Sequence, residues 1–332
     1  MGRGHLALGM SSGERARVGA IFPGQGSQSV GMGADVSAND ANAKQLFERA
    51  SKLLGYDLLA MQAAGPDEKL RETQVSQPAI FVTNVALYAA VGAAFAPVVS
   101  AGHSFGEICS LTIADSLTFD DAVRVVDQRG RAMQAAADVA PGGMSAVLGL
   151  DDARIRQVVA TVRERTGLRV ELANFNSPTQ IVISGDLAGV QVAGEAMLEA
   201  GAKRVVPLNV SGAWHSALMK PAVERFAAAV AAATFVLPAF DVVSNVDARP
   251  YRDVATIRHN LVASITQEVR WHEVAQRLIS YELDLVVEFG ASPVLGPLMK
   301  RMSGAPDAIS VGDFAGVQKL REKLAQLQEV RR

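Results

Sequence analysis

The chain has 332 residues, of which 49% are hydrophobic and 20% charged, and its formal net charge is −2. This balance is that of a globular protein with one large domain, or with one large and one small domain. The near-neutral net charge gives no sign of a nucleic-acid or membrane partner.

Two further features bound the class of protein. We find no apolar run long enough to span a bilayer, and residues 1–17 lack the apolar core of a signal peptide, so we interpret them as a disordered N-terminal extension. The single cysteine, Cys109, excludes an internal disulfide and favours a reducing, cytoplasmic environment.

Regular structure starts with a short apolar run, Val18–Phe22, which predicts a buried strand. The loop 23–28 is rich in glycine but has neither the G-x-G-x-x-G nor the G-x-x-x-x-G-K-[ST] spacing, so we do not expect it to bind phosphate. Its glycines would instead let backbone N–H groups approach a substrate. A polar turn is expected at 73–78, with Pro78 in the first turn of a long buried helix, 79–95.

A glycine-flanked serine is the candidate nucleophile. Residues 97–101 predict a strand and Glu107 begins a predicted helix, so Gly102-His103-Ser104-Phe105-Gly106 has the form G-x-S-x-G between the two. The glycines allow a sharp turn with Ser104 at its tip, and the helix N-terminus favours negative charge on the serine oxygen. An ordinary strand-to-helix turn has the same glycines, but the elements on both sides favour a nucleophile.

The pattern changes after Pro141. Gly142 and Gly143 predict a hinge, and the next segment has the order β-α-β-β-α-β, which is typical of a ferredoxin-like fold. A loop rich in turn-forming residues is expected between its middle strands, at 174–178. Helices and strands alternate again after residue 210, which predicts a parallel sheet with helices on both faces. The prediction is therefore a large α/β domain, 18–140 and 210–332, with an inserted small domain, 141–209.

A serine nucleophile needs a base, and His215 is the best candidate among the five histidines. It lies in a loop of small residues just before a helix, where catalytic groups are often presented. His103 adjoins Ser104 and should leave the turn in another direction, and His259 and His272 lie in polar stretches typical of the surface. No carboxylate stands out as the acid of an α/β-hydrolase triad, which argues against an ordinary esterase. A backbone carbonyl can orient the histidine instead.

Five short motifs in register resemble those of the malonyl-CoA:acyl-carrier-protein transacylases. They are FPGQGSQ at 22–28, GHSFGE at 102–107, QRGRAM at 128–133, NFNSP at 174–178 and HSALM at 215–219. The resemblance covers nearly the whole chain from Val18 and implies an α/β-hydrolase-like large domain with an inserted ferredoxin-like small domain. It also implies an acyltransferase that moves malonyl from malonyl-CoA, through a serine ester, to the phosphopantetheine thiol of an acyl carrier protein, for fatty-acid or polyketide synthesis.

The resemblance gives these residues their expected roles. Ser104 would attack the thioester, and His215 would take the proton and later activate the carrier-protein thiol. Backbone N–H groups of Gln25 and Phe105 would form the oxyanion hole. Arg129 would hold the malonyl carboxylate by two parallel hydrogen bonds, so that acetyl-CoA should be rejected.

The remaining expectations are less direct. Asn176 and His103 would support the substrate pocket. No metal and no bound cofactor are expected, the partners are a coenzyme A thioester and the carrier protein, and the protein would be a monomer. We expect a basic patch for docking the carrier protein at Lys203, Arg204 and Lys220.

Two positions depart from the family's usual pattern. Phe105 stands where relatives carry Leu, Ile or Val, or Gln in some methylmalonyl-selective members, so the ring either narrows the pocket or admits a different acyl group. Ser264 stands where the family commonly has a glutamine whose backbone carbonyl orients the histidine. If only the carbonyl matters, Ser264 can serve.

Two other functions stay open at this stage. A thioester hydrolase could clear acyl groups from carrier proteins, but relatives of that kind tend to lack the arginine, so Arg129 argues against it. A non-catalytic module could dock carrier proteins, but the intact set of Ser104, His215 and Arg129 argues against that.

Overall fold

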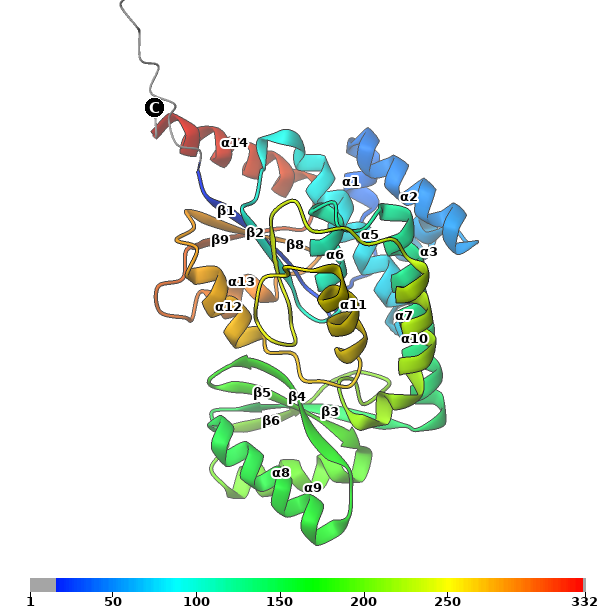
Figure 1. Cartoon of the computed structure of the whole chain (residues 1–332), viewed down its shortest axis with the longest axis vertical. Helices are drawn as coiled ribbons and strands as arrows, with labels where there is room; N and C mark the ends of the chain where they lie inside the picture. The colour runs from blue at the N-terminus through cyan, green and yellow to red at the C-terminus, as the bar shows by residue number, and fades with distance from the viewer. Residues whose placement is uncertain (1–15, 331–332) are drawn as a thin grey trace, which may run out of the picture.

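Short apolar runs form a five-stranded sheet in the large domain of the computed structural model, which describes residues 16–330 (Figure 1). All neighbouring strands of this sheet are parallel, as predicted. In spatial order they are β7 (Asp241–Val243), β2 (Val99–Gly102), β1 (Val18–Phe22), β8 (Leu285–Phe289) and β9 (Asp307–Val311). Residues 1–15 of the predicted extension lie outside the described residues.

Helices cover both faces of this sheet, which explains why β1, β2 and β8 are buried along their whole length. On β1, Ala20 and Phe22 face the larger apolar core, whereas Ile21 between them faces a second core on the other side. Helices α5 (Thr73–Val91), α6 (Gly106–Ile113) and α14 (Phe314–Val330) pack on the first side. Helices α12 (Trp271–Ile279) and α13 (Leu295–Met299) pack on the second.

The helices of the large domain are α1 (Ala34–Asn39), α2 (Ala41–Leu54), α3 (Leu58–Ala64), α4 (Asp67–Arg71), α5 (Thr73–Val91), η1 (Gly92–Ala94), α6 (Gly106–Ile113), α7 (Phe119–Val139), η2 (Ala217–Met219), α10 (Lys220–Ala232), α11 (Val254–Ala263), α12 (Trp271–Ile279), α13 (Leu295–Met299) and α14 (Phe314–Val330).

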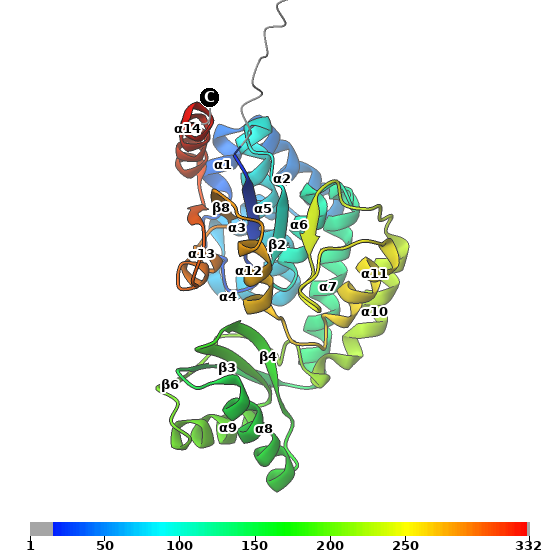
Figure 2. The same cartoon turned by 60° about the vertical axis from the view of Figure 1, so that its left-hand side comes forward.

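The small domain lies at one end of the molecule, below the large domain in Figures 1 and 2. Its antiparallel sheet has the order β4-β5-β3-β6, and α8 (Asp152–Thr166) and α9 (Leu187–Glu199) pack on one face over a separate apolar core. This is the predicted ferredoxin-like order. The strands are β3 (Gly142–Leu148), β4 (Val170–Ser177), β5 (Gln180–Asp186) and β6 (Arg204–Pro207).

Two predictions for the small domain are wrong in detail. Gly142 and Gly143 are not a hinge but the first residues of β3, where they pair with Asp186 and Gly185 of β5. Most of the predicted loop 174–178 is the end of β4, because two register shifts let the strand continue to Ser177. Local turn propensity is overridden by cross-strand pairing in both places.

The predicted turn at 73–78 is also wrong, because α5 already begins at Thr73 and Pro78 lies inside it. Two hydrogen bonds to distant residues hold this first part of the helix. Gln134 Oε1 accepts from the Thr73 N–H at 3.0 Å, and Gln25 Nε2 donates to Thr73 Oγ1 at 3.1 Å. With η1, the stretch Thr73–Ala94 is long and apolar enough to cross a membrane by length and composition alone, so the expectation of no such run needs correction. About 72% of the tested window is buried inside the protein, as in a core helix.

Glu288, at the end of β8, fixes the short helix α13 that follows it. Its side chain is fully buried and accepts hydrogen bonds from the backbone N–H groups of Val294 and Leu295, both at 2.7 Å, and of Gly296 at 2.9 Å. Ser310 Oγ donates a fourth bond at 3.0 Å. The buried carboxylate thus accepts hydrogen bonds from backbone N–H groups at the helix N-terminus, which have no partner within the helix.

We predict that Glu288→Gln lowers the free energy of unfolding by about 3 kcal/mol. The NH₂ group of the glutamine would face the buried N–H donors, which then lack an acceptor. Urea unfolding followed by circular dichroism checks this, with the exposed Glu322→Gln as the matched control. Equal midpoints for the two variants would contradict the assignment.

Candidate active site

Ser104 lies at the tip of a sharp turn between β2 and α6. Its φ angle is +54°, in the left-handed region that residues with a side chain rarely adopt. The turn is possible because the flanking residues are glycines: a Cβ on Gly102 would lie 1.9 Å from the carbonyl carbon of Gly106, and one on Gly106 would lie 2.4 Å from Phe22 O. The turn therefore has the predicted form of a nucleophile elbow.

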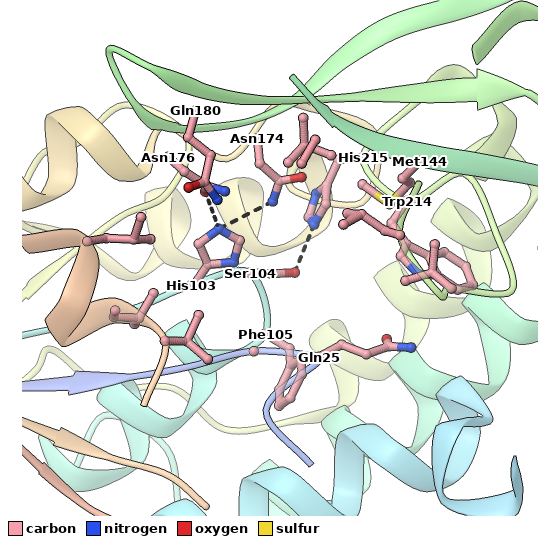
Figure 3. Close-up of a pocket in the computed structure, with 18 of the residues that line it drawn as sticks. Gln25, His103, Ser104, Phe105, Met144, Asn174, Asn176, Gln180, Trp214 and His215 are labelled. Carbon is pink, nitrogen blue, oxygen red and sulfur yellow. Dashed lines mark hydrogen bonds between the residues drawn. The ribbon is translucent and has the colours of Figure 1, made fainter. Parts of the chain in front are cut away.

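His215 lies next to this serine, with its Nε2 2.9 Å from Ser104 Oγ (Figure 3). Its Nδ1 lies 2.8 Å from Ser264 O and 3.2 Å from Gln267 O. Since a carbonyl only accepts, Nδ1 carries the proton and Nε2 is left as the acceptor for the serine hydroxyl. The predicted Ser264 carbonyl is thus in place, and Gln267 supplies a second carbonyl that sequence reasoning missed.

The environment of His215 keeps its imidazole neutral. The pKa of His215 falls from 6.5 to about 3, chiefly because the ring is buried and also because Arg129 and His103 lie nearby, while the hydrogen bonds to the two carbonyls partly oppose the fall. A neutral imidazole is the form that can take a proton from the serine.

Arg129 projects from α7 to the same serine. Its Nη2 donates to Ser104 Oγ at 3.1 Å and its Nη1 donates to Gln77 Oε1 at 3.0 Å. Arg129 is 1% exposed, and among the described ion pairs none joins its guanidinium to a carboxylate. Burial lowers the pKa of Arg129 to about 10, so it remains a cation at neutral pH. A buried cation beside the serine is suited to bind an anionic group.

His103 leaves the turn in another direction and meets the small domain. Its Nε2 lies 3.0 Å from Asn176 Oδ1 and 3.3 Å from Asn174 Nδ2, both on β4 (Figure 3). Burial lowers the pKa of His103 to about 4, so its ring is uncharged. The ring lies against Trp271 of α12 with 5.9 Å between centroids. His103 and Asn176 thus join the two domains at the pocket.

The glycine-rich loop after β1 lies on the other side of the elbow. A Cβ on Gly24 would lie 2.7 Å from His103 O, which places the next residue, Gln25, beside the serine. Phe105 follows the serine, and its ring is 1% exposed within the large core. Figure 3 shows this ring on the opposite side of the elbow from His215.

The serine, both histidines, the arginine and the glycine-rich loop border one cavity of about 380 Å³ between the domains. The large domain contributes Ser104, Arg129 and His215, and the small domain contributes apolar groups such as Met144 and Val182. Val294, Leu298 and Arg301 of the α13 segment also line it. Within residues 16–330, no three metal-ligating side chains gather at one place.

Sequence comparison assigns the chain to a family, since the model of the acyl transferase domain matches residues 20–328. The chain belongs to the acyl transferase domain family. A malonyl CoA-acyl carrier protein transacylase of Salmonella typhimurium (strain LT2) is 43% identical over 299 residues, which cover 90% of this chain and 96% of the relative.

Solved structures of the same family confirm the predicted fold class. A malonyl-transacylase solved in complex with its type II polyketide-synthase acyl-carrier protein matches with a TM-score of 0.89 and 38% identity, over 93% of this chain and 100% of that one. The malonyl CoA-acyl carrier protein transacylase of Coxiella burnetii matches with a TM-score of 0.88 and 33% identity, over 93% of this chain and 98% of that one.

Several residues of the site carry no sequence signal strong enough to find them. Gln77, which binds Arg129, lies in the stretch expected to be a turn, although a glutamine beside a long, mostly apolar helix is a usable hint. Asn174 lies in the stretch expected to be a loop. Gln267 acts through its backbone, which no side-chain pattern reveals.

We predict that Ser104 keeps its reactivity toward a fluorophosphonate from pH 8 down to about pH 5. A histidine with a pKa of 6.5 would be mostly protonated at pH 5 and would lose reactivity there, whereas a pKa of about 3 leaves His215 neutral. Arg129→Leu removes a positive charge that lowers the pKa of His215, so in this variant the labelling rate should begin to fall at a higher pH.

The measurement is the rate of fluorophosphonate labelling against pH, followed by intact-mass spectrometry. Arg131→Leu is the matched control, because Arg131 lies on the same helix but pairs with Asp127 at 2.9 Å. The prediction would be refuted if the labelling rate of the wild type fell near pH 6.5, or if Arg129→Leu did not shift the pH at which the rate falls.

Proposed function

We propose that this protein transfers malonyl from malonyl-CoA to the phosphopantetheine thiol of an acyl carrier protein through an ester on Ser104. The observation that carries the proposal is the meeting of three groups: Ser104 Oγ lies 2.9 Å from His215 Nε2 and 3.1 Å from Arg129 Nη2. A nucleophile, its base and a buried cation for a free carboxylate are thus together at the end of one cavity.

In the first half-reaction Ser104 Oγ attacks the thioester carbon of malonyl-CoA while its proton passes to His215 Nε2. The tetrahedral intermediate collapses, the C–S bond breaks, and His215 returns the proton to the leaving coenzyme A thiol. The Nδ1–H keeps donating to the carbonyls of Ser264 and Gln267, which holds the ring in the orientation that this transfer needs.

The oxyanion that develops on the thioester carbonyl needs N–H donors beside the serine. The backbone N–H groups of Gln25 and Phe105 are the candidates, because the loop after β1 packs against the elbow and Phe105 opens helix α6. Removal of one such donor in other acyl-transfer enzymes costs about 10²–10³-fold in rate.

Arg129 selects the acyl group. Without substrate its donors are used by Ser104 Oγ and Gln77 Oε1, and a malonyl carboxylate would take the place of the serine oxygen on the guanidinium. An acetyl group would leave this buried cation without a partner, so we expect discrimination of about 10⁴-fold, as in other sites built around one polar contact.

In the second half-reaction the carrier-protein thiol gives its proton to His215 and attacks the malonyl ester, and Ser104 Oγ regains the proton. None of these steps needs a resident cofactor or metal. The relative solved with its acyl-carrier protein supports this partner. The exposed Lys203, Arg204 and Lys220 remain candidates for docking it, and a monomer in the cytoplasm, where the buried free Cys109 stays reduced, completes the proposal.

Hydrolysis of acyl thioesters is the weaker alternative, because a buried arginine without a carboxylate partner has no use in releasing uncharged acyl groups to water. Phe105 borders the cavity, but it is 1% exposed and packs in the large core, so it gives no reason to prefer a different acyl unit. We therefore keep malonyl as the proposed substrate.

We predict that Arg129→Ala lowers kcat/KM for malonyl-CoA by about 10³-fold, because a buried charged partner is lost. Arg129→Lys should recover only part of this loss, since an ammonium cannot form the two parallel bonds. Intact-mass spectrometry of the Ser104 ester, after incubation with malonyl-CoA or acetyl-CoA, measures both effects, with Arg131→Ala as the control. A malonyl adduct that forms as fast in Arg129→Ala as in the wild type would contradict the proposal.

A further inference from the structure

A buried carboxylate that the proposed reaction does not use lies directly behind the elbow. Glu107, in the first turn of α6, is 1% exposed. Its Oε1 accepts from Tyr251 Oη, and its Oε2 accepts from both the backbone N–H of Asn245, at 3.0 Å, and the Asn245 side chain. In each of these three hydrogen bonds a carboxyl oxygen of Glu107 is the acceptor.

Asn245 carries this network to the serine. Its Oδ1 accepts from the Ser104 N–H at 3.3 Å, and its Nδ2 donates to Gly102 O at 2.8 Å, with Ser104 O 3.4 Å away. One amide side chain thereby holds the backbone on both sides of the left-handed residue. Because the Ser104 N–H is used in this way, the oxyanion hole is left to other backbone donors.

The fold explains how Asn245 comes to this place. It lies two residues beyond β7, the parallel neighbour of β2, so the ends of the two strands meet at the same edge of the sheet. Asn245 O also accepts from the Arg270 N–H at 3.1 Å, which ties the residue to the start of α12. The 1% exposed side chain therefore has little freedom to move.

Glu107 decides which way the Asn245 amide faces. The two ends of an amide differ only in being donor or acceptor, and a carboxylate accepts the NH₂ end. With Nδ2 drawn to Glu107, Oδ1 must face the Ser104 N–H. With the amide reversed, its NH₂ group would face that N–H, donor against donor.

We propose that Asn245 is a positioning residue that holds the Ser104 elbow in its strained conformation, and that Glu107 is the buried carboxyl group that orients Asn245. The proposal rests on Ser104 being the nucleophile of the proposed function. Neither residue touches the substrate, so the effect is on the reactivity of Ser104 rather than on the binding of malonyl-CoA.

The test compares two reactions of the full chain. One is acylation by malonyl-CoA in a single turnover, and the other is labelling by a fluorophosphonate. In the second reaction Ser104 Oγ bonds to phosphorus, fluoride leaves and His215 takes the proton, so that no malonyl recognition is needed. A wild type that is labelled but not acylated would refute the proposed function and still allow the elbow to be tested.

For Asn245→Ala we expect both rates to fall by about 10²-fold, the loss that a small displacement of a reacting group causes. The malonyl-CoA concentration that gives half the maximal acylation rate should change less than about threefold, since Arg129 is untouched. Glu107→Gln keeps the volume but no longer fixes the amide, so we expect an intermediate loss of about tenfold in both rates.

Asn260→Ala is the matched control. Asn260 is also a buried asparagine behind the site, 5% exposed, but its Nδ2 donates to Ser244 Oγ at 3.0 Å and it does not reach the elbow. We expect its two rates to stay within about threefold of the wild type. Thermal unfolding of each variant shows how much stability is lost.

If Asn245→Ala is labelled at the wild-type rate, Asn245 has only a structural role. The same follows if Asn260→Ala and Asn245→Ala lose equal stability and their labelling rates fall equally. If Asn245→Ala does not fold, Glu107→Gln decides the question: labelling at the wild-type rate then overturns the proposal. A rise in the half-saturating malonyl-CoA concentration without a fall in the labelling rate also overturns it.

Discussion

The left-handed backbone at Ser104 is the constraint on which the site depends. A non-glycine residue in this region costs about 1–3 kcal/mol and persists only where surrounding contacts enforce it. Here the enforcing contacts come from three directions: Gly102 packs on Gly106, Gly106 packs on Phe22, and Asn245 binds the backbone on both sides of the serine. His215 also has a positive φ, +59°, so both members of the pair are held by their surroundings.

The second constraint is the buried charge of Arg129. Removing a cation from water without an anion in contact is expensive, and the structure offsets this cost with Gln77 Oε1, Ser104 Oγ and the through-space field of Glu107. Glu107 is fully engaged by Tyr251 and Asn245, so it stabilises the cation without occupying its N–H groups. The guanidinium therefore stays available for a carboxylate that enters the cavity.

The sequence predicts the parts of this arrangement that local patterns encode. The elbow glycines, the parallel sheet and the β-α-β-β-α-β order follow from spacing and composition, and the structure agrees with each. Asn245 and Gln77 escape prediction because they act over 141 and 52 residues of chain. The end of β4 escapes because strand pairing, a non-local interaction, overrides the turn propensity of its asparagines.

Strand β4 shows why the two domains work as one unit. Its backbone pairs with the segment that orients His215: the Phe175 N–H donates to Val269 O at 2.8 Å, and the Val269 N–H donates to Ala173 O at 2.8 Å. Its Glu171 carboxylate accepts from the Ala217 N–H, two residues after His215, at 2.8 Å. The strand that brings Asn174 and Asn176 to His103 thus also fixes the carbonyls behind the base. A displacement of the small domain would therefore disturb the pocket wall and the alignment of His215 together.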